Sequence, residues 1–597
     1  AYSANQKQRR MQRQARDAYN AGLQDRLNMV SSPDGARSRV YGEVRNVDGV
    51  IFKAAHGANS EFYTLVVAIA GHECQSIEKV YFNDQELTLG SDGAGGFWVQ
   101  TEPYQLSSIV SAQEQMAMAG TAASVTLDHT PIAGSVTCVQ TSNDDTGTYS
   151  FTPTVDGTSV TGTVPIPTGQ PVICSYQYTL AQPKARVWKY LGTAGQDIGS
   201  DLLASRFPAL INTGTNDDRF AGICCLVVEL EYDQDAFPLG VPNVTALVRG
   251  AKCYDPRTAT TVWTKNPAII ARDWSLYAYG GGCVSAELHE AAFTAAANAC
   301  DVSTDFVTPD GTETRPLYQC DIVCKLDAPP DQGWLSEIVE SMAGKWGWAG
   351  GQLTLVAGVY HAPVATITED WISNHGDIGL VKDSPLSDTV NVYRPSIANA
   401  DAPVSGDGTG TTAAYAMAPM PEVRSAAYIT ADGLELPREI ALGGVTHNVH
   451  AQHICGVLMR DARYSMMLSL PCKMHAWQLE LFDVVYVTLP IFGLAAQQFE
   501  VLGWQFDAEK GMTLTLKKID ASIFDPAANF DLPNAELNTS LVLPWVVPEV
   551  EGLTVTSGTA PLEDGTPQAR VLVSWDQSTN ASVLQSGKIE VQYGEVT

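Results

Sequence analysis

Histidines are the first residues in the sequence whose type and spacing could do chemistry. His447, His450 and His453 repeat at intervals of three residues, and an imidazole nitrogen is a common ligand of zinc. On a helix, His450 and His453 could share one face, but successive steps of three residues drift around the helix axis. We find no carboxylate or cysteine that completes a ligand set, so the series favours packed histidines over a metal site.

A second pair with possible chemistry is His72 beside Glu73, which could act as a general base and acid. No third partner is evident in the sequence. A histidine next to a glutamate at a strand end is more often held by hydrogen bonds, so we expect neither residue to be catalytic.

The twelve cysteines contain no C-x-x-C pair. Cys320 and Cys324 have the spacing C-x-x-x-C, which is a weak metal signature, and the neighbours Cys224 and Cys225 cannot readily bridge each other. Most cysteines lie in apolar stretches, where a free thiol behaves as a small hydrophobic residue. We therefore expect reduced core cysteines in a protein that folds in a cytoplasm.

Three tryptophans, Trp334, Trp346 and Trp348, could form a platform for a sugar ring. Core packing is the better interpretation, because tryptophan buries a large area and this region must form a core. The sequence thus predicts no catalytic residue, no metal ligand, and neither a cofactor nor a residue to bind one.

The elements around these residues are clearest between Ala246 and Gly282. Residues 246–254 and 260–263 predict two strands joined by a tight turn at 255–258, which makes a hairpin. Asn266 suits a helix N-cap and Pro267 the first helical position. The helix that follows has an apolar face formed by Ile270, Trp274 and Tyr277, and Gly280-Gly281-Gly282 can end it.

Other helices and hairpins follow from the same signals. We expect helices over residues 4–30, 285–300, 334–345 and 450–463, and a hairpin over 346–353 with glycines at its bend. The face of the third of these helices that should be buried consists of Leu335, Ile338, Val339 and Met342.

Composition bounds the class of protein. The 597 residues include 45% hydrophobic and only 17% charged residues, with 50 Gly and 32 Pro, which favours β structure with many turns. The net charge of −30 makes nucleic acid an unfavourable bound ligand. Residues 1–40 are the exception, because they contain eight basic residues and only three acidic ones. We interpret this as a solvated helix face, with docking on an acidic neighbour as the alternative. The sequence shows no signal peptide and no apolar run long enough to span a membrane.

Several phrases of the sequence resemble the central tail-tip (hub) proteins of long-tailed bacteriophages, the family of the lambda tip attachment protein J. The opening phrases are Y-G-x-V-R and A-G-H-E, which lie within 41–73. Next comes V-x-G-x-x-x-Y-D-P-R-T with W-x-x-N-P-A over 248–268, and then W-x-W-x-G-G-x-L over 346–353. The later phrases are SPLSDTVNVY over 384–393 and the strand-forming segments between 460 and 520. Relatives have G-D-x-V where this chain has Phe482-Asp483-Val484-Val485, so Phe482 replaces a glycine and leaves the turn type open.

The resemblance implies a mainly β fold with some α, a multidomain α+β protein with two tube-like β domains. The expected domains are 1–37, an N-terminal helical arm; 38–104 with 184–245, a first hub β domain; 105–183, an inserted small β domain; 246–380, a mixed α/β domain; 381–535, a second tube-like β domain; and 536–597, a linker and the start of a fibronectin type III domain. The first three strands of that last domain include Trp575 and Tyr593. Because half a sandwich cannot bury its own face, we expect the natural polypeptide to continue.

The resemblance also implies a function and a set of partners. The chain would be a structural protein of the virion, at the distal tail tip and assembled in the host cytoplasm. It would form a homotrimer that closes the tail tube and gates genome ejection. Expected partners are the distal tail protein, other tail-tip proteins, the tape-measure protein, receptor-binding proteins or fibres, and a host cell-surface receptor. DNA would only pass through its channel.

Two other functions remain open at this stage. No phosphate-binding loop, H-E-x-x-H or G-x-S-x-G phrase is present, so we expect no enzyme. Carboxylates are plentiful, however, and a cell-wall (peptidoglycan) hydrolase with two acidic residues across a cleft is the alternative. A surface adhesin built of β modules is disfavoured by the missing signal peptide and the unpatterned cysteines.

Overall fold

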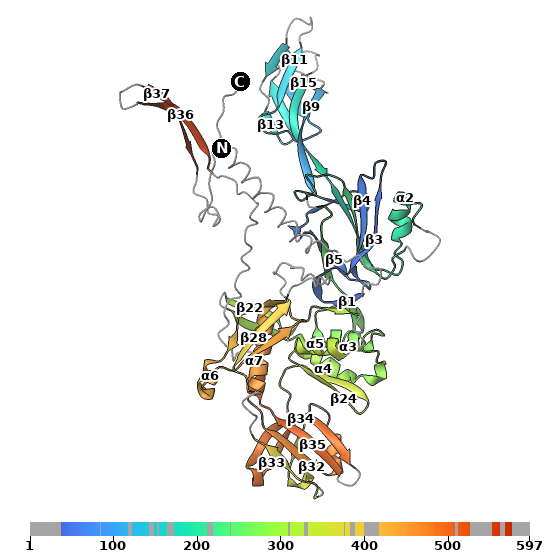
Figure 1. Ribbon diagram of the computed structural model, residues 1–597, viewed down its shortest axis with the longest axis vertical. Coiled ribbons are helices and arrows are strands. Elements are labelled where there is room, and N and C mark those ends of the chain that lie inside the picture. Colours follow the sequence, from blue (N-terminus) through green and yellow to red (C-terminus); the bar gives the residue numbers. More distant parts are fainter. Residues whose placement is uncertain are drawn as a thin grey trace, which may run out of the picture. The chain divides into compact units, whose positions relative to one another are not determined.

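The computed structural model describes residues 37–83, 85–116, 122–141, 148–151, 154–163, 172–211, 219–238, 240–308, 311–326, 332–374, 376–382, 389–398, 417–507, 511–525, 552–561 and 567–575. The chain divides into two compact units, residues 1–535 and 536–597. The expected helix over 4–30 and the strand around Tyr593 lie outside the described residues. Sheets dominate the described residues and helices are fewer, so the fold is mainly β with some α (Figure 1). None of the described helices is long and apolar enough to cross a membrane.

The first β region consists of two sheets that share one core. The six-stranded sheet has the order β3 (Gly49–His56), β4 (Phe62–Ala70), β17 (Cys224–Glu231), β16 (Ala185–Leu191), β8 (Phe97–Val99) and β7 (Leu89–Ser91). The four-stranded sheet has the order β2 (Glu43–Asn46), β18 (Val244–Arg249), β5 (Ser76–Phe82) and β6 (Gln85–Glu86). Alternating apolar residues of both sheets fill the space between them. The other face of the six-stranded sheet is covered by the short helices η1 (Gly199–Leu203) and α2 (Ala204–Arg206).

A small β module is inserted into this region through a long ribbon (Figure 1). The ribbon is formed by β9 (Gln105–Met116) and β15 (Val172–Pro183), which pair antiparallel from Gln105 opposite Pro183 to Met116 opposite Val172. The rest of the module is β11 (Thr137–Thr141) and β12 (Thr148–Phe151) in the same sheet, and β10 (Ala122–Thr126), β14 (Ser159–Thr163) and β13 (Thr154–Asp156) in a second sheet. β5, before the module, and β16, after it, belong to different sheets and meet across one core.

The module corrects the expectation that all cysteines are reduced. Cys138 on β11 lies directly opposite Cys174 on β15, with Cα atoms 4.3 Å apart, and the two form a disulfide. Sequence spacing cannot reveal this pair, because 36 residues separate the partners and only the strand register brings them together. The other ten cysteines are free, and nine of them are buried.

The α/β region packs four main helices around a large core. Its helices are α3 (Pro267–Leu276), α4 (Glu290–Cys300), α5 (Gln332–Glu340) and α7 (Asn448–Asp461), with the short η2 (Ser285–Glu287) and α6 (Ala426–Asp432). Its hairpins are β19 (Lys252–Asp255) with β20 (Thr260–Trp263), β21 (Ser303–Thr308) with β22 (Gly311–Pro316), and β24 (Lys345–Ala349) with β25 (Gln352–Val356). Two more sheets complete the region. One pairs β1 (Ser38–Tyr41) with β23 (Ile322–Lys325), and the other pairs β28 (Val392–Ala398) with β29 (Met417–Pro419), β30 (Val423–Arg424) and β31 (Pro437–Leu442).

Most local predictions in this region are confirmed. The hairpin β24–β25 turns at Gly350-Gly351, and Leu335, Ile338, Val339 and Met342 are buried. The expected strand 246–254 is wrong, because it splits at Gly250 into β18 and β19, which join different sheets. A Cβ atom at Gly250 would lie 2.2 Å from the carbonyl oxygen of Val40, so the close approach of β1 forces the break.

The expected helix 285–300 is also shorter than predicted. Leu288 forms a parallel bridge with Leu353, and the N–H of His289 donates to the carbonyl of Leu353 at 2.9 Å. These contacts keep Leu288 extended and hold His289 outside the helical conformation, so α4 begins only at Glu290.

The second β region is a six-stranded sheet with its own core. The order is β26 (Ala365–Ile367), β33 (Val484–Leu489), β34 (Leu494–Asp507), β35 (Gly511–Lys518), β32 (Met467–Cys472) and β27 (Gly379–Val381). Short helical turns lie beside it at η3 (Glu369–Trp371), η5 (Met474–Gln478), η6 (Pro490–Phe492) and η7 (Ala521–Phe524). Buried side chains from strands across the sheet, such as Phe499 and Leu514, form the core. The second unit contributes one described hairpin, β36 (Thr554–Pro561) with β37 (Pro567–Ser574), followed by Trp575.

Candidate functional site

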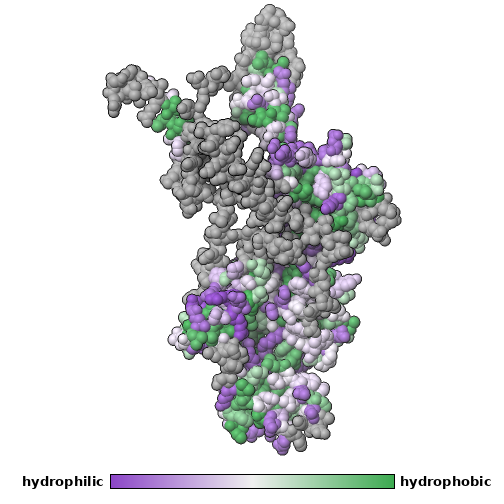
Figure 2. Space-filling model, viewed as in Figure 1, coloured by the Kyte–Doolittle hydropathy of each residue, from purple (hydrophilic) through white to green (hydrophobic). Residues whose placement is uncertain are grey.

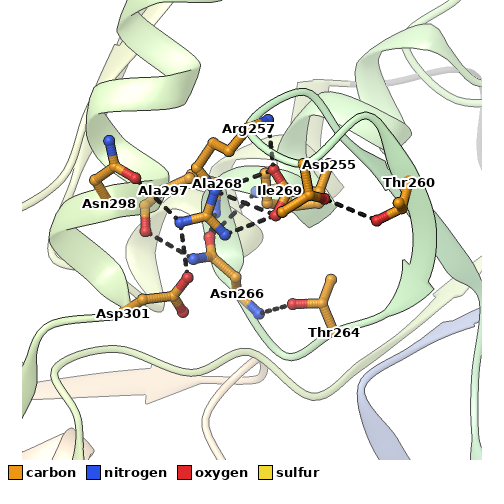
Figure 3. Close-up of polar contacts among 11 residues, drawn as sticks. Asp255, Arg257, Thr260, Thr264, Asn266, Ala268, Ile269, Ala297, Asn298 and Asp301 are labelled. Carbon is orange, nitrogen blue, oxygen red and sulfur yellow. Dashed lines mark hydrogen bonds and ion pairs between the residues drawn. The ribbon is translucent and has the colours of Figure 1, made fainter.

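Polar side chains of the Asp-Pro-Arg turn between β19 and β20 connect this hairpin to α4 (Figure 3). We call such a connection between two segments a joint. The guanidinium of Arg257 donates to both carboxylate oxygens of Asp255, at 2.8–3.2 Å, and also reaches Asp301 at 2.8 Å and Asn298 at 3.3 Å. The hydrogen bonds from Arg257 lower the pKa of Asp255. Because Asn298 and Asp301 lie at the C-terminal end of α4, a positive charge there is favourable. The turn therefore fastens the hairpin to α4.

Asn266 makes the next joint, and its prediction as an N-cap is confirmed. Its Oδ1 accepts hydrogen bonds from the N–H groups of Ala268 and Ile269, and its Nδ2 donates to the carbonyl of Ala297 on α4 at 2.8 Å (Figure 3). Pro267 follows at the first helical position. One amide side chain thus starts α3 and fixes it against α4.

Gly42, in the phrase Tyr41-Gly42-Glu43-Val44-Arg45, lies at a third joint. Its φ is +69°, and a Cβ atom there would lie 2.2 Å from Oδ1 of Asp321. That buried carboxylate accepts from the N–H of Glu43 at 2.7 Å and from the hydroxyl of Thr446 at 2.6 Å, and it pairs with Lys265 at 3.2 Å. Glycine is required here because the backbone must approach a carboxylate that joins four segments.

His72 is a structural residue. Its Nε2 accepts the N–H of Val40 at 2.8 Å, and its Nδ1 donates to the carbonyl of Glu73 at 2.8 Å, so both ring nitrogens are occupied. Burial, with a contribution from Arg39, lowers the pKa of His72 to about 4. The Glu73 carboxylate pairs with Lys252 at 2.9 Å. The two residues therefore serve packing and do not form an acid–base pair.

The histidines of α7 also belong to the core. His450 Nε2 donates to the carbonyl of Pro316 at 3.0 Å, and His453 Nε2 lies 3.3 Å from the hydroxyl of Tyr318. Burial lowers the pKa of His450 to about 4 and that of His453 to about 3. His447 is half exposed, 3.9 Å from Glu313. The described residues contain no group of three or more side chains arranged to hold a metal ion, and Cys320 and Cys324 are buried as free thiols.

The tryptophans divide between the core and the surface. Trp334 and Trp346 pack against the α/β core, and their indole N–H groups donate to Lys325 and Ser336, as core packing predicts. Trp348 is 48% exposed. An aromatic cluster that the sequence analysis missed lies on the second β region, where Trp477 contacts Trp504 and Phe506. On the face drawn in Figure 2, hydrophobic and hydrophilic residues are interspersed over the described parts.

The sequence analysis also missed a cavity of about 340 Å³. Its walls are α4, β25, residues 361–364 and the turn 480–484, so segments far apart in the sequence surround it. His289, His361, Glu480 and Asp483 are the titratable groups in its lining. One sequence signal pointed here, namely Phe482, which stands where the resembled hub phrase has glycine and has a left-handed φ of +73°.

Comparisons with known proteins find similar solved structures. No family model matches the chain, and no curated protein matches it. A chain of the virion of the native gene transfer agent particle is similar in structure, with a TM-score of 0.45, 13% identity, and coverage of 84% of this chain and 88% of that one. The prophage tail protein gp18 from Listeria monocytogenes EGD-e has a TM-score of 0.20, 11% identity, and coverage of 36% and 59%. The chain is thus similar to components of a gene transfer agent virion and of a prophage tail.

Proposed function

We propose that this chain is a structural protein of a phage-like tail, the central hub of the tail tip, without a catalytic role of its own. The observation that carries the proposal is the role of the residues in the shared phrases. Gly42, Asp255, Arg257 and Asn266 all belong to those phrases, and all of them fasten one segment to another. Residues that hold segments of the chain together determine its architecture. The phrases that contain these residues resemble those of hub proteins, so we propose the architecture of a hub.

The two β regions support the proposal further. Each has a six-stranded sheet with its own core, and the edges β3, β7, β26 and β27 pair on one side only within the described residues. Free edges can pair with a neighbouring subunit. Three copies with two β regions each would supply six similar units, which matches a hub between a sixfold tube and a threefold tip.

The same proposal covers gating and partners. The trimer closes the distal end of the tail tube, carries fibres or receptor-binding proteins, and opens for the tape-measure protein and then DNA. A net charge of −30 suits a passage through which DNA slides without binding. The distal tail protein, other tail-tip proteins and a host surface receptor complete the set of proposed partners.

The first test is the mass and shape of the purified chain. Light scattering should give three times the 64.0 kDa of one chain, and electron-microscope class averages should show threefold rings. A monomer at all concentrations, also in the presence of the distal tail protein, would contradict the hub. Incubation with purified peptidoglycan separates the alternative, because release of soluble glycan or peptide fragments would make the chain a hydrolase.

A further inference from the structure

Two free cysteines lie side by side in the first β region. Cys74 belongs to the connection between β4 and β5, and Cys224 is the first residue of β17. Both side chains belong to the core between the two sheets, with 1% and 0% of their surface exposed. The whole inserted module lies between them in the sequence, so only the fold brings the two thiols together.

Backbone contacts fix this approach. The N–H of Cys74 donates to the carbonyl of Leu191 at 2.9 Å, and Leu191 lies directly opposite Cys224 in the ladder of β16 and β17. The next residue, Gly192, has a φ of +85°. A Cβ atom on it would lie 2.7 Å from the nitrogen of Cys224 and 2.7 Å from the carbonyl oxygen of His72. Glycine therefore leaves the room that the two cysteine-bearing segments need to come this close.

The two thiols also contact each other. The hydrogen bond with the Cys74 thiol, together with burial, raises the pKa of Cys224 well above its ordinary value. Cys225, the next residue, has no such neighbour, because its side chain lies on the other face of the sheet, in the core under η1 and α2. Burial raises the pKa of Cys225 to about 12. Two adjacent residues of one strand thus differ in whether a second thiol is within reach.

The inserted module shows that burial does not prevent two cysteines of this chain from bridging. Cys138 and Cys174 are each 1% exposed, yet they form a disulfide. Cys74 is open to the same kind of oxidant, because the connection that carries it is not part of a strand and its neighbours Glu73 and Gln75 are exposed. A local opening of this connection would expose the thiol without unfolding either sheet.

We propose that Cys74 and Cys224 form a second disulfide when the chain meets a low-molecular-weight disulfide such as oxidised glutathione. The thiolate of Cys74 attacks one sulfur of this reagent, which forms a mixed disulfide and releases the first reduced thiol. The thiolate of Cys224 then attacks the sulfur of Cys74, which forms the new bond and releases the second reduced thiol. The two cysteines lose two protons and two electrons, and the two released thiols carry them away.

The new bond would close a long loop at the base of the inserted module. The chain between the two cysteines includes β5 to β16 and the whole module. A crosslink restricts the unfolded chain, and the restriction grows with the length of the closed loop. The oxidised chain should therefore unfold at a temperature about 5 °C higher than the reduced chain, or more. This consequence does not depend on what the chain assembles into.

Peptide mapping of the full wild-type chain tests the proposal. The folded chain is incubated overnight with oxidised glutathione, because a raised pKa keeps the thiolate scarce and the reaction slow. Its remaining thiols are then alkylated in denaturant, and it is digested with trypsin without reduction. We expect tryptic peptide 54–79, which contains Cys74, joined to peptide 220–249, which contains Cys224. Absence of this joined product in a sample whose Cys138–Cys174 disulfide is complete would overturn the proposal.

Serine and alanine variants identify the thiols that react. Cys225→Ser is the matched control, and it should keep both the joined peptides and the higher unfolding temperature. Cys224→Ser should lose both, and so should Cys74→Ala, which lies outside the strands and tests the pair even if the strand does not tolerate serine. Thermal unfolding of each reduced variant establishes that it is folded. If a folded Cys224→Ser variant still gives the joined peptides, Cys225 is the partner and the proposal fails.

Discussion

Cysteine plays opposite roles in the inserted β module and in the α/β region. In the α/β region, Cys253, Cys300, Cys320, Cys324 and Cys455 are free thiols in a large apolar core. In the module the described core is small and consists of Leu127, Cys138, Val160, Cys174 and Tyr176, and two of these form the disulfide. A large core is stable through burial alone, whereas a small one gains most from a covalent crosslink. The environment, more than the residue type, decides what a cysteine contributes.

The largest effect should come from the core of the α/β region. Trp274 is 2% exposed, so Trp274→Ala leaves a cavity and should lower the free energy of unfolding by about 3–5 kcal/mol. Trp348→Ala is the control, because that side chain is 48% exposed and should cost about 1 kcal/mol or less. Chemical denaturation measures both. Similar losses in the two variants would mean that the α/β core does not depend on burial of Trp274.

The disulfide should matter nearly as much, but only within the module. Chain entropy for partners 36 residues apart gives a loss of about 4 kcal/mol for the double variant Cys138→Ala with Cys174→Ala. The rate of amide hydrogen exchange, followed by mass spectrometry, should rise in peptides from β9 to β15 and stay unchanged in peptides from α3 to α7. Cys283→Ser, at a half-buried free thiol, should change neither. Faster exchange in α3 to α7 of the double variant would show that the module and the α/β region are energetically coupled.

Acid should act on the α/β region and spare the module. His450 and His453 are buried and neutral, with pKa values lowered to about 4 and about 3. Below pH 6.5 these histidines bind protons in the unfolded chain but not in the folded chain. The free energy of unfolding therefore has its full value above pH 6.5 and falls as the pH drops toward 4. At pH 5 each histidine should contribute a loss of about 2 kcal/mol.

His450→Gln should flatten this pH dependence, which denaturation curves at pH 5 and pH 7 measure. In the module, His129 is exposed and stacks on Tyr178. The protection of β9 to β15 against exchange, measured relative to the intrinsic exchange rate at each pH, should therefore change little over the same range. Equal acid sensitivity of both regions would contradict the assignment of this effect to the buried histidines of α7.

The smallest effect concerns a single cap. Asn266→Ala removes the hydrogen bonds to Ala268 and Ile269 and one of the two that reach the carbonyl of Ala297, which keeps the N–H of Asp301 as a donor. We expect a loss of about 1–2 kcal/mol, measured by thermal unfolding. Ser425→Ala, at the N-cap of α6, is the comparison and should cost about 0.5–1 kcal/mol, because that helix is short and none of its residues is buried. A larger loss at Ser425 would contradict the role of Asn266 as a joint.

Local signals were sufficient for the elements whose physics is local. The cap at Asn266, the helix start at Pro267 and the hairpin at Gly350-Gly351 each depend on neighbours within a few residues, and all three are present. The buried face of α5 follows from helical spacing in the same way. A few residues are enough because backbone hydrogen bonds and caps form between residues that are close in sequence.

Tertiary structure decided the rest, because the deciding contacts join distant residues. The break of the strand at Gly250 depends on Val40, and the late start of α4 depends on Leu353. The pairing of Cys138 with Cys174 depends on strand register, and the cavity beside Asp483 depends on four separate segments. The sequence alone contains the residues of each of these features but does not show which of them meet. Only the folded chain sets which of them come within contact distance, and hence which thiols bridge and which residues line a common cavity.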